Sequence, residues 1–194
     1  MRKMYLSAPL PFVGQKRMLA KEFMKVLEQY PDGTLFVDLF GGSGLLSHIT
    51  KSLKPHSTVI YNDFDNYRFR MKHIPQTNQL LADIREMVGN SVPRHKIIKG
   101  ELRERIFSRI EQEENSTGYV DFITLSSSIL FSMKYKLSVQ DMRKEALYNN
   151  IRKTGYPECT DYLEGLEIVS CDYKEVFNRY KDIPGVVFLV DPPY

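Results

Sequence analysis

The chain has 194 residues, of which 42% are hydrophobic and 26% are charged, proportions typical of a water-soluble globular protein. Its formal net charge of +3 permits a polyanionic partner without requiring one. The two cysteines, Cys159 and Cys171, have no metal-ligand companions and form no disulfide pattern, which favours a reducing compartment. No apolar run is long enough for a membrane span or a secretory signal. We therefore predict a cytoplasmic protein with no membrane partner and no metal.

The N-terminal part is typical of the start of a parallel α/β sheet. Apolar positions recur at helical spacing over residues 16–30, and the turn residues 31–33 end that helix. Residues 34–40 (TLFVDLF) predict a buried strand, residues 41–44 (GGSG) a loop, and residues 45–54 a second helix. Residues 57–63 (STVIYND) predict a second strand that ends in an acid. In such sheets, ligands bind beyond the carboxyl ends of the strands.

The middle of the chain differs in character. Residues 66–165 are rich in Arg, Lys and Glu, with helical patterns over 79–89, 101–114 and 121–137. Strand patterns return at residues 166–173 (LEIVSCDY) and 185–194 (GVVFLVDPPY). We therefore predict one catalytic domain made of residues 1–65 and 166–194, split by a mainly helical insertion over residues 66–165.

The glycine-rich loop is the first candidate binding element. Gly41, Gly42 and Gly44 lie between a buried strand and a helix, where a ligand can approach the backbone because no Cβ atoms intervene. The free N–H groups of the following helix point into the same space. A nicotinamide-dinucleotide fingerprint would require Gly or Ala at position 47, where Ser47 stands. A sharp turn without a ligand would also need such glycines.

An acid follows the second predicted strand. Asp63 comes 25 residues after Asp38 and could accept both hydroxyls of a ribose, whereas Asp65 already lies in the following turn. The alternative role of Asp63 is to cap the next helix. Together with the glycine loop, this acid suggests a ligand that contains a nucleoside.

The D-P-P-Y motif at residues 191–194 fits an amine on a flat heterocycle. The Asp191 carboxylate can accept one N–H, and the Pro192 carbonyl can accept another. Pro192 and Pro193 hold φ nearly fixed, so this acceptor geometry is stiff. Tyr194 offers a face on which a base can stack, a contact that contributes about 1–3 kcal/mol. The alternative is a strand that ends in a proline turn, with Tyr194 as a packing residue.

Four segments occur in an order that resembles the Dam-like family of DNA adenine methyltransferases. These enzymes transfer a methyl group from S-adenosylmethionine (SAM) to the exocyclic N6 amine of adenine. The segments are PFVGQKR (11–17), VDLFGGSG (37–44), YNDFD (61–65), and VSCDYKEVF (169–177) followed by VVFLVDPPY (186–194). They frame nearly the whole chain, and their ordered set is very specific.

The resemblance implies a Rossmann-like SAM-methyltransferase sheet and a role for each matched residue. Asp63 would hold the ribose, Asp172 the amine of the cofactor's adenine, and Lys16 would lie at the cofactor and target-base pocket. The implied cofactor-binding residues are Lys16, Asp38, Phe40, Gly41, Gly42, Gly44, Asp63, Asp172 and Tyr173. The implied catalytic residues are Asp191, Pro192, Pro193 and Tyr194, which would grip a flipped-out adenine during direct in-line methyl transfer.

The family places its target-recognition region between the cofactor half and the D-P-P-Y motif. By this resemblance, residues 66–165 would be the target-recognition region, and double-stranded DNA would be the partner. The basic residues Arg94, Lys96, Lys99, Arg103 and Arg105 suit phosphate contacts. A solvated helix face balanced by the acids of residues 111–114 explains them equally well. A cognate restriction endonuclease is a further candidate partner.

Enzymes of this type continue with strands beyond the D-P-P-Y strand, whereas this sequence stops there. Three explanations fit: a truncated form of an active enzyme, a second chain that completes the sheet, or a degenerate remnant; we favour the first. The isolated chain is then expected to bind SAM weakly and to be poorly stable, because an apolar strand lies at the sheet edge. Two alternative functions stay open: an RNA adenine methyltransferase, and a catalytically inactive DNA-binding remnant.

Overall fold

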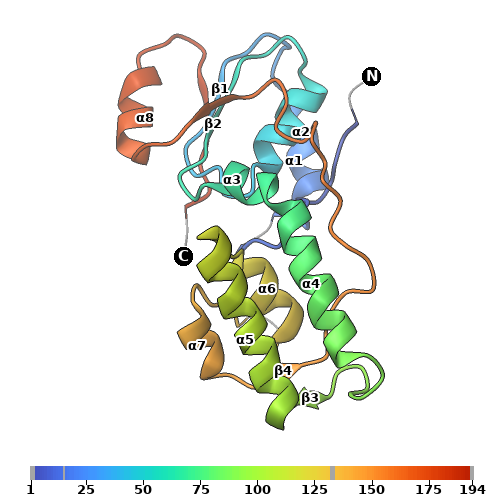
Figure 1. Cartoon of the computed structure of the whole chain (residues 1–194). Helices are drawn as coiled ribbons and strands as arrows, with labels where there is room; N and C mark the ends of the chain where they lie inside the picture. Colours follow the sequence, from blue (N-terminus) through green and yellow to red (C-terminus); the bar gives the residue numbers. More distant parts are fainter. Residues whose placement is uncertain (1–2, 15, 132–133, 193–194) are drawn as a thin grey trace. The chain divides into compact units, whose positions relative to one another are not determined.

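The computed structural model describes residues 3–14, 16–131 and 134–192. The chain forms two compact units (Figure 1): unit 1 comprises Met1–Met71 and Cys159–Tyr194, and unit 2 comprises Lys72–Glu158. The boundaries of the units thus lie at 71/72 and 158/159, compared with the predicted domain boundaries at 65/66 and 165/166. Within the described ranges, no helix is long and apolar enough to cross a membrane.

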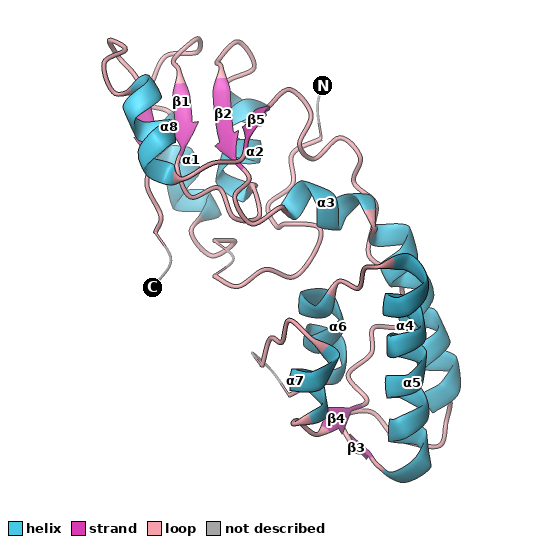
Figure 2. Ribbon diagram, turned by 60° about the vertical axis from the view of Figure 1, so that its left-hand side comes forward, coloured by secondary structure: helices cyan, strands magenta, loops and turns pink. Residues whose placement is uncertain are grey.

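Unit 1 is built on a four-stranded sheet in the order β5-β2-β1-β6. The strands are β1 (Phe36–Asp38), β2 (Val59–Asn62), β5 (Glu167–Val169) and β6 (Val187–Leu189), and Figure 2 shows β1, β2 and β5 side by side. All three pairings are parallel, with Val37 opposite Ile60 on one side and Phe188 on the other. The predicted α/β fold with a parallel sheet is confirmed. Because the strands are parallel, their carboxyl ends meet at one edge.

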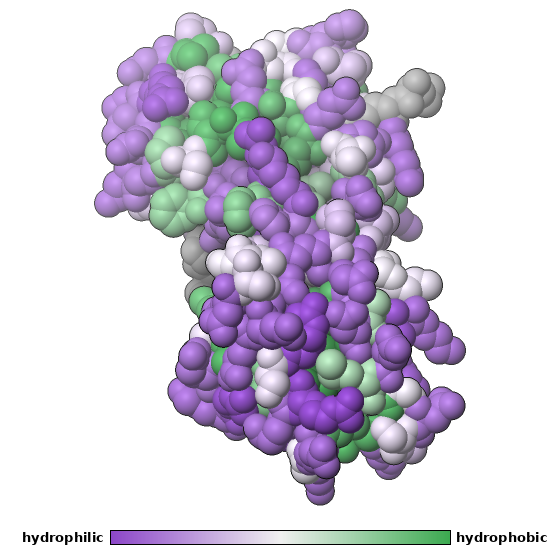
Figure 3. Space-filling view, in the orientation of Figure 1, coloured by the Kyte–Doolittle hydropathy of each residue, from purple (hydrophilic) through white to green (hydrophobic). Residues whose placement is uncertain are grey.

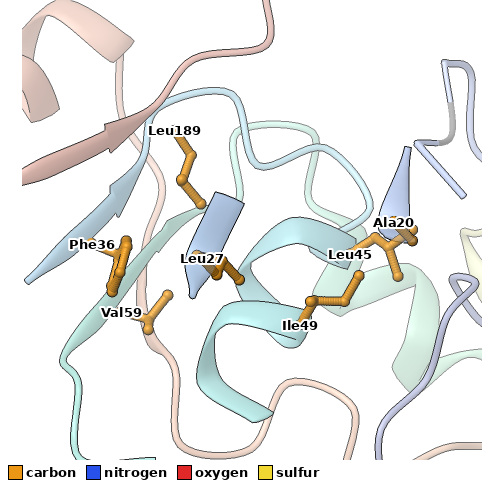
Figure 4. Close-up of a cluster of buried hydrophobic side chains, with 7 residues drawn as sticks. All are labelled: Ala20, Leu27, Phe36, Leu45, Ile49, Val59 and Leu189. Carbon is orange, nitrogen blue, oxygen red and sulfur yellow. The ribbon is translucent and has the colours of Figure 1, made fainter. Parts of the chain in front are cut away.

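Helices cover both faces of this sheet, as a parallel sheet requires. On one face, α1 (Ala20–Leu27) and α2 (Leu45–Leu53) pack against the strands through a cluster drawn in Figure 4. Its buried members are Ala20, Leu27, Phe36, Leu45, Ile49, Val59 and Leu189. On the other face, Val37, Leu39 and Ile60 pack with Val176 of α8 (Tyr173–Tyr180). The alternation of Phe36 and Val37 between the two clusters follows from the two-residue period of a strand.

The described part of unit 2 is mainly helical. It contains α4 (Ile74–Val88), α5 (Gly100–Thr117), α6 (Phe122–Ile129) and α7 (Val139–Arg143), and α3 (Tyr67–Lys72) leads into it from unit 1. Two short strands, β3 (Ile97–Ile98) and β4 (Leu147–Tyr148), pair antiparallel. The face of unit 2 seen in Figure 3 is mostly hydrophilic, whereas hydrophobic side chains gather around the sheet of unit 1.

The helical pattern over residues 121–137 extends too far. Helix α6 ends at Ile129, and the described residues 134–137 are not helical. Three consecutive serines near its end bond back to the helix: the hydroxyl of Ser126 donates to Ile123, and those of Ser127 and Ser128 donate to Thr124. Such side chains compete with the backbone for its carbonyls, which weakens a helix interior.

Candidate active site

A cavity of about 520 Å³ opens at the carboxyl-end edge of the sheet in unit 1. Its walls come from the residues that follow β1, β2 and β6, from residues 12–14 and 16 of the N-terminal segment, and from the start of α8. This placement is where a parallel α/β sheet holds its ligands. The volume lies within the range of small-molecule sites, about 300–1,000 Å³.

The glycine loop forms one wall of the cavity, and neighbouring side chains leave no room for a Cβ atom at Gly41 or Gly42. A Cβ atom at Gly41 would lie 2.3 Å from the ring of Tyr61, and one at Gly42 would lie 2.9 Å from the ring of Phe12. Gly42 and Gly44 have φ angles of 48° and 71°, which L side chains rarely adopt. Gly41 and Gly42 line the cavity, whereas Gly44 does not; it is the N-cap of α2, and a Cβ atom there would meet Leu163 and Tyr61.

Asp38 ends β1 beneath this loop. Its side chain is 1% exposed, and the Ser47 hydroxyl donates to its Oδ2 atom at 2.7 Å. Burial is the main cause that raises the pKa of Asp38 to about 7; the nearby carboxylate of Asp191 acts in the same direction, and the hydrogen bond from Ser47 opposes both. Near neutral pH this acid is therefore partly protonated, and a cation beside it would favour its charged form.

Lys16 and Asp191 meet inside the cavity. The Lys16 ammonium lies 2.8 Å from Asp191 Oδ1, and both side chains are about three-quarters buried. A buried ion pair of this kind fixes the carboxylate in one place and offsets its charge. Pro192 follows at the cavity wall. The predicted catalytic residues Pro193 and Tyr194 lie outside the described residues.

An aromatic pair and an acid complete the predicted cofactor set. The rings of Phe40 and Tyr173 have centroids 4.9 Å apart and are tilted by 35°, and both residues line the cavity. Asp172 also lines it, and its carboxylate accepts the backbone N–H of Lys174 at 2.8 Å as the cap of α8. A flat base could pack against such rings while its polar edge meets the acid.

Asp63 is placed differently from the other predicted residues. It is buried and does not line the cavity; its carboxylate accepts the backbone N–H groups of Tyr67 at 2.6 Å and Arg68 at 3.0 Å. This is the helix-capping role that the sequence also allowed, and the ribose contact of Asp63 stays a prediction. Asn62, Phe64 and Asp65 line the cavity instead.

Sequence reasoning missed Asn62 as a site residue. Its buried side chain donates from Nδ2 to the carbonyls of Leu39 and Cys171, each at 3.0 Å, and its Oδ1 accepts the Cys171 N–H at 3.2 Å. It therefore joins the carboxyl ends of β1, β2 and β5. An asparagine at the end of an otherwise apolar strand was the available signal, because a buried amide needs several partners.

The cavity lining is negatively charged. Its described residues include four aspartates, Asp38, Asp65, Asp172 and Asp191, and one cationic side chain, Lys16. In the described ranges, no group of three or more His, Cys, Asp or Glu residues is arranged to hold a metal ion. Such a wall favours an organic cation and disfavours the pyrophosphate of a dinucleotide.

Comparison with known proteins identifies the family. The family profile described as "D12 class N6 adenine-specific DNA methyltransferase" matches residues 12–194, and the chain belongs to this family. A protein of Haemophilus influenzae named "Putative methyltransferase" is 40% identical over 197 residues, which cover 100% of this chain and 66% of the relative. The chain thus spans 66% of the length of the curated relative that it matches. The adenine-methyltransferase family predicted from the four segments is confirmed.

Proposed function

We propose that the protein transfers a methyl group from SAM to N6 of a flipped-out adenine in double-stranded DNA. The observation that carries this proposal is the meeting of the glycine loop, the Phe40–Tyr173 pair and the Lys16–Asp191 ion pair in one cavity. Family membership supports methyl transfer; the cofactor, the DNA substrate and the residue roles are our inference.

The cavity suits SAM in charge and in shape. SAM supplies a methyl group activated by a positively charged sulfonium. Its net positive charge matches a wall with four aspartates, and this charge would favour the ionised form of Asp38. Gly41 and Gly42 bring the loop backbone to the cavity wall, and the two aromatic rings provide a platform for its adenine.

Asp191 would orient the target amine. Its carboxylate would accept one N–H, the Pro192 carbonyl a second, and the nitrogen lone pair would then point at the methyl carbon. A C–N bond would form as the C–S bond of SAM breaks, S-adenosylhomocysteine would leave, and the proton that the amine loses would pass to the Asp191 carboxylate. Because Lys16 already bonds Asp191 at 2.8 Å, the incoming amine must share or displace this ammonium. Fixing these groups before reaction lowers the barrier through orientation.

Unit 2 would be the target-recognition region. The basic stretch over residues 94–105 has two parts. Arg103 is committed to protein contacts, since it bonds the Glu104 carboxylate at 2.7 Å and the Arg143 carbonyl at 2.6 Å. Lys96 and Lys99 are exposed, and neither forms an ion pair with a described residue. These two lysines and the similarly exposed Arg105 are stronger candidates for phosphate contacts than Arg103.

Methyl transfer to defined acceptors tests the proposal. Labelled SAM is incubated with unmethylated duplex DNA and, separately, with structured RNA, using the 194-residue chain and a version extended past Tyr194. We expect N6-methyladenine in the DNA arm and its loss in Asp191→Ala. Label in RNA alone would support the RNA alternative. No label from either version would overturn the catalytic proposal and favour a DNA-binding remnant. A restriction endonuclease partner and a cytoplasmic location stay predictions.

A further inference from the structure

Two fully buried tyrosines hold the glycine loop from beneath. Tyr61, in β2, is 0% exposed, and its ring lies closest to where a Cβ atom at Gly41 would be and second closest to that position at Gly44. Tyr162 is also 0% exposed and belongs to the segment that returns to unit 1 after Cys159. Neither residue lines the cavity.

The hydroxyl groups of these tyrosines bond successive carbonyls of the loop. Tyr61 donates to the carbonyl of Gly42 at 2.8 Å, and Tyr162 donates to the carbonyl of Ser43 at 3.1 Å. The Tyr61 hydroxyl is shared with Asp63 Oδ1 at 3.0 Å, the carboxylate that caps α3. Two independent side chains, from segments far apart in the sequence, thus converge on one turn of the backbone.

The second tyrosine is itself fixed. The ring of His48, in α2, stacks on that of Tyr162 with centroids 4.7 Å apart, and His48 Nδ1 lies 2.7 Å from the Tyr162 carbonyl. The adjacent Leu163 lies 3.0 Å from where a Cβ atom at Gly44 would be. The loop therefore packs against buried side chains, whereas a turn on the surface would not.

We propose that Tyr61 and Tyr162 are positioning residues that preorganise the glycine loop for the cofactor. This inference rests on the proposed function, because its ligand is SAM. Three glycines among four residues give the loop unusual backbone freedom, and ordering it on binding would weaken affinity. The two hydroxyls fix the loop in advance, so the bound conformation is already populated in the free chain.

Phenylalanine substitutions test this role, because they keep each ring and remove only the hydroxyl. In Tyr61→Phe and in Tyr162→Phe we expect the dissociation constant for SAM, measured by calorimetry, to rise about two- to tenfold, the effect of one hydrogen bond. Turnover at saturating SAM and the KM for DNA should stay within about twofold, because the hydroxyls touch neither reacting group. A purely structural role would instead lower the melting temperature and leave SAM affinity unchanged.

Hydrogen exchange gives a readout without ligand. The Gly44 N–H donates to the Gly41 carbonyl at 2.7 Å across the loop, so its exchange reports how tightly the loop is closed. We expect faster exchange at Gly44 in both variants. The control is Tyr156→Phe, which removes a buried hydroxyl from unit 2 and should change neither exchange at Gly44 nor SAM affinity.

The outcomes separate this inference from the function on which it rests. Wild-type affinity and wild-type exchange in both loop variants would overturn the positioning role. A wild-type chain that fails to bind SAM would overturn the proposed cofactor, while exchange at Gly44 would still show whether the hydroxyls hold the loop. If Tyr156→Phe lost as much SAM affinity as the two loop variants, the effect would come from general destabilisation, and this result would also overturn the inference.

Discussion

Asp38 shows how the surroundings of a single residue set its proton occupancy. The carboxylate is buried and lies near the charge of Asp191, and these two effects outweigh the hydrogen bond that it accepts from the Ser47 hydroxyl. Its pKa therefore rises from 3.8 to about 7. At pH values between these two pKa values, Asp38 keeps its proton in the folded chain and has lost it in the unfolded chain. This group therefore makes folding less favourable as pH rises through that window, and the loss is complete above the folded pKa.

The substitution Asp38→Asn should remove this pH dependence. Relative to the variant, the wild-type chain is expected to lose stability between about pH 4 and about pH 7, by up to a few kcal/mol at about 1.4 kcal/mol per pH unit. Denaturant unfolding of both chains at the two ends of this window measures the difference. A difference independent of pH would show that burial does not perturb this carboxyl.

Single residues were also where sequence reasoning reached its limit. Asp191 was predicted from the D-P-P-Y motif and Lys16 from the family resemblance. The ion pair between them could not be predicted from sequence, because it depends on where the N-terminal segment folds back. Asp63 and Asp65 differ by two positions, yet one caps a helix and the other faces the cavity. Side-chain direction at the end of a strand is decided by the next turn, which a strand pattern does not encode.

At the scale of elements, the strand–loop–helix unit around the glycines was well predicted. The pattern of buried strand, GGSG and amphipathic helix corresponds to β1, the loop and α2. The strands are shorter than predicted, because apolar residues such as Leu35 and Leu39 continue the hydrophobic core on either side of β1. The pair β3–β4 was missed, since two-residue strands leave no periodic signal.

Substitution of Gly41 tests how tightly this unit is built. In Gly41→Ala, the new methyl group would lie 2.3 Å from the Tyr61 ring and 2.8 Å from the Asn62 carbonyl oxygen, so the loop or β2 must shift. We expect a loss of roughly 2–4 kcal/mol in unfolding free energy, larger than overpacking at a tolerant site. Chemical denaturation is the measurement.

The matched control is Gly118→Ala. Gly118 has a φ of 72° and no atom within 4 Å of its Cβ position, so only backbone strain is added there. A cost of about 1–2 kcal/mol is expected from the left-handed conformation alone. Gly41 has no left-handed φ, so a loss in Gly41→Ala comes from the close contact alone. A Gly41→Ala variant as stable as the wild type would show that this contact has no energetic weight.

At the scale of the whole molecule, the exposed lysines of unit 2 are expected to contribute to DNA affinity and to its dependence on salt. Lys96→Ala and Lys99→Ala should each weaken binding similarly for all sequences and reduce the salt slope of log affinity by about 1, if each neutralises one phosphate. Binding titrations across a salt series provide the slopes. Lys25→Ala is the control, because Lys25 in unit 1 pairs with Glu22 at 3.0 Å. Slopes unchanged in all three variants would remove these lysines from the DNA interface.

The strand order of unit 1 has a consequence for how the chain folds as it is made. The central strand β1 pairs with β2, which follows soon after it, and with β6, which follows only after the whole of unit 2. During synthesis one edge of β1 must therefore wait unpaired while unit 2, a continuous stretch of chain, can already collapse. Contacts between residues so distant in sequence form slowly. We expect nascent chains that lack β6 to be cut by protease within unit 1 while unit 2 resists, and equal resistance of both units would contradict this order of assembly.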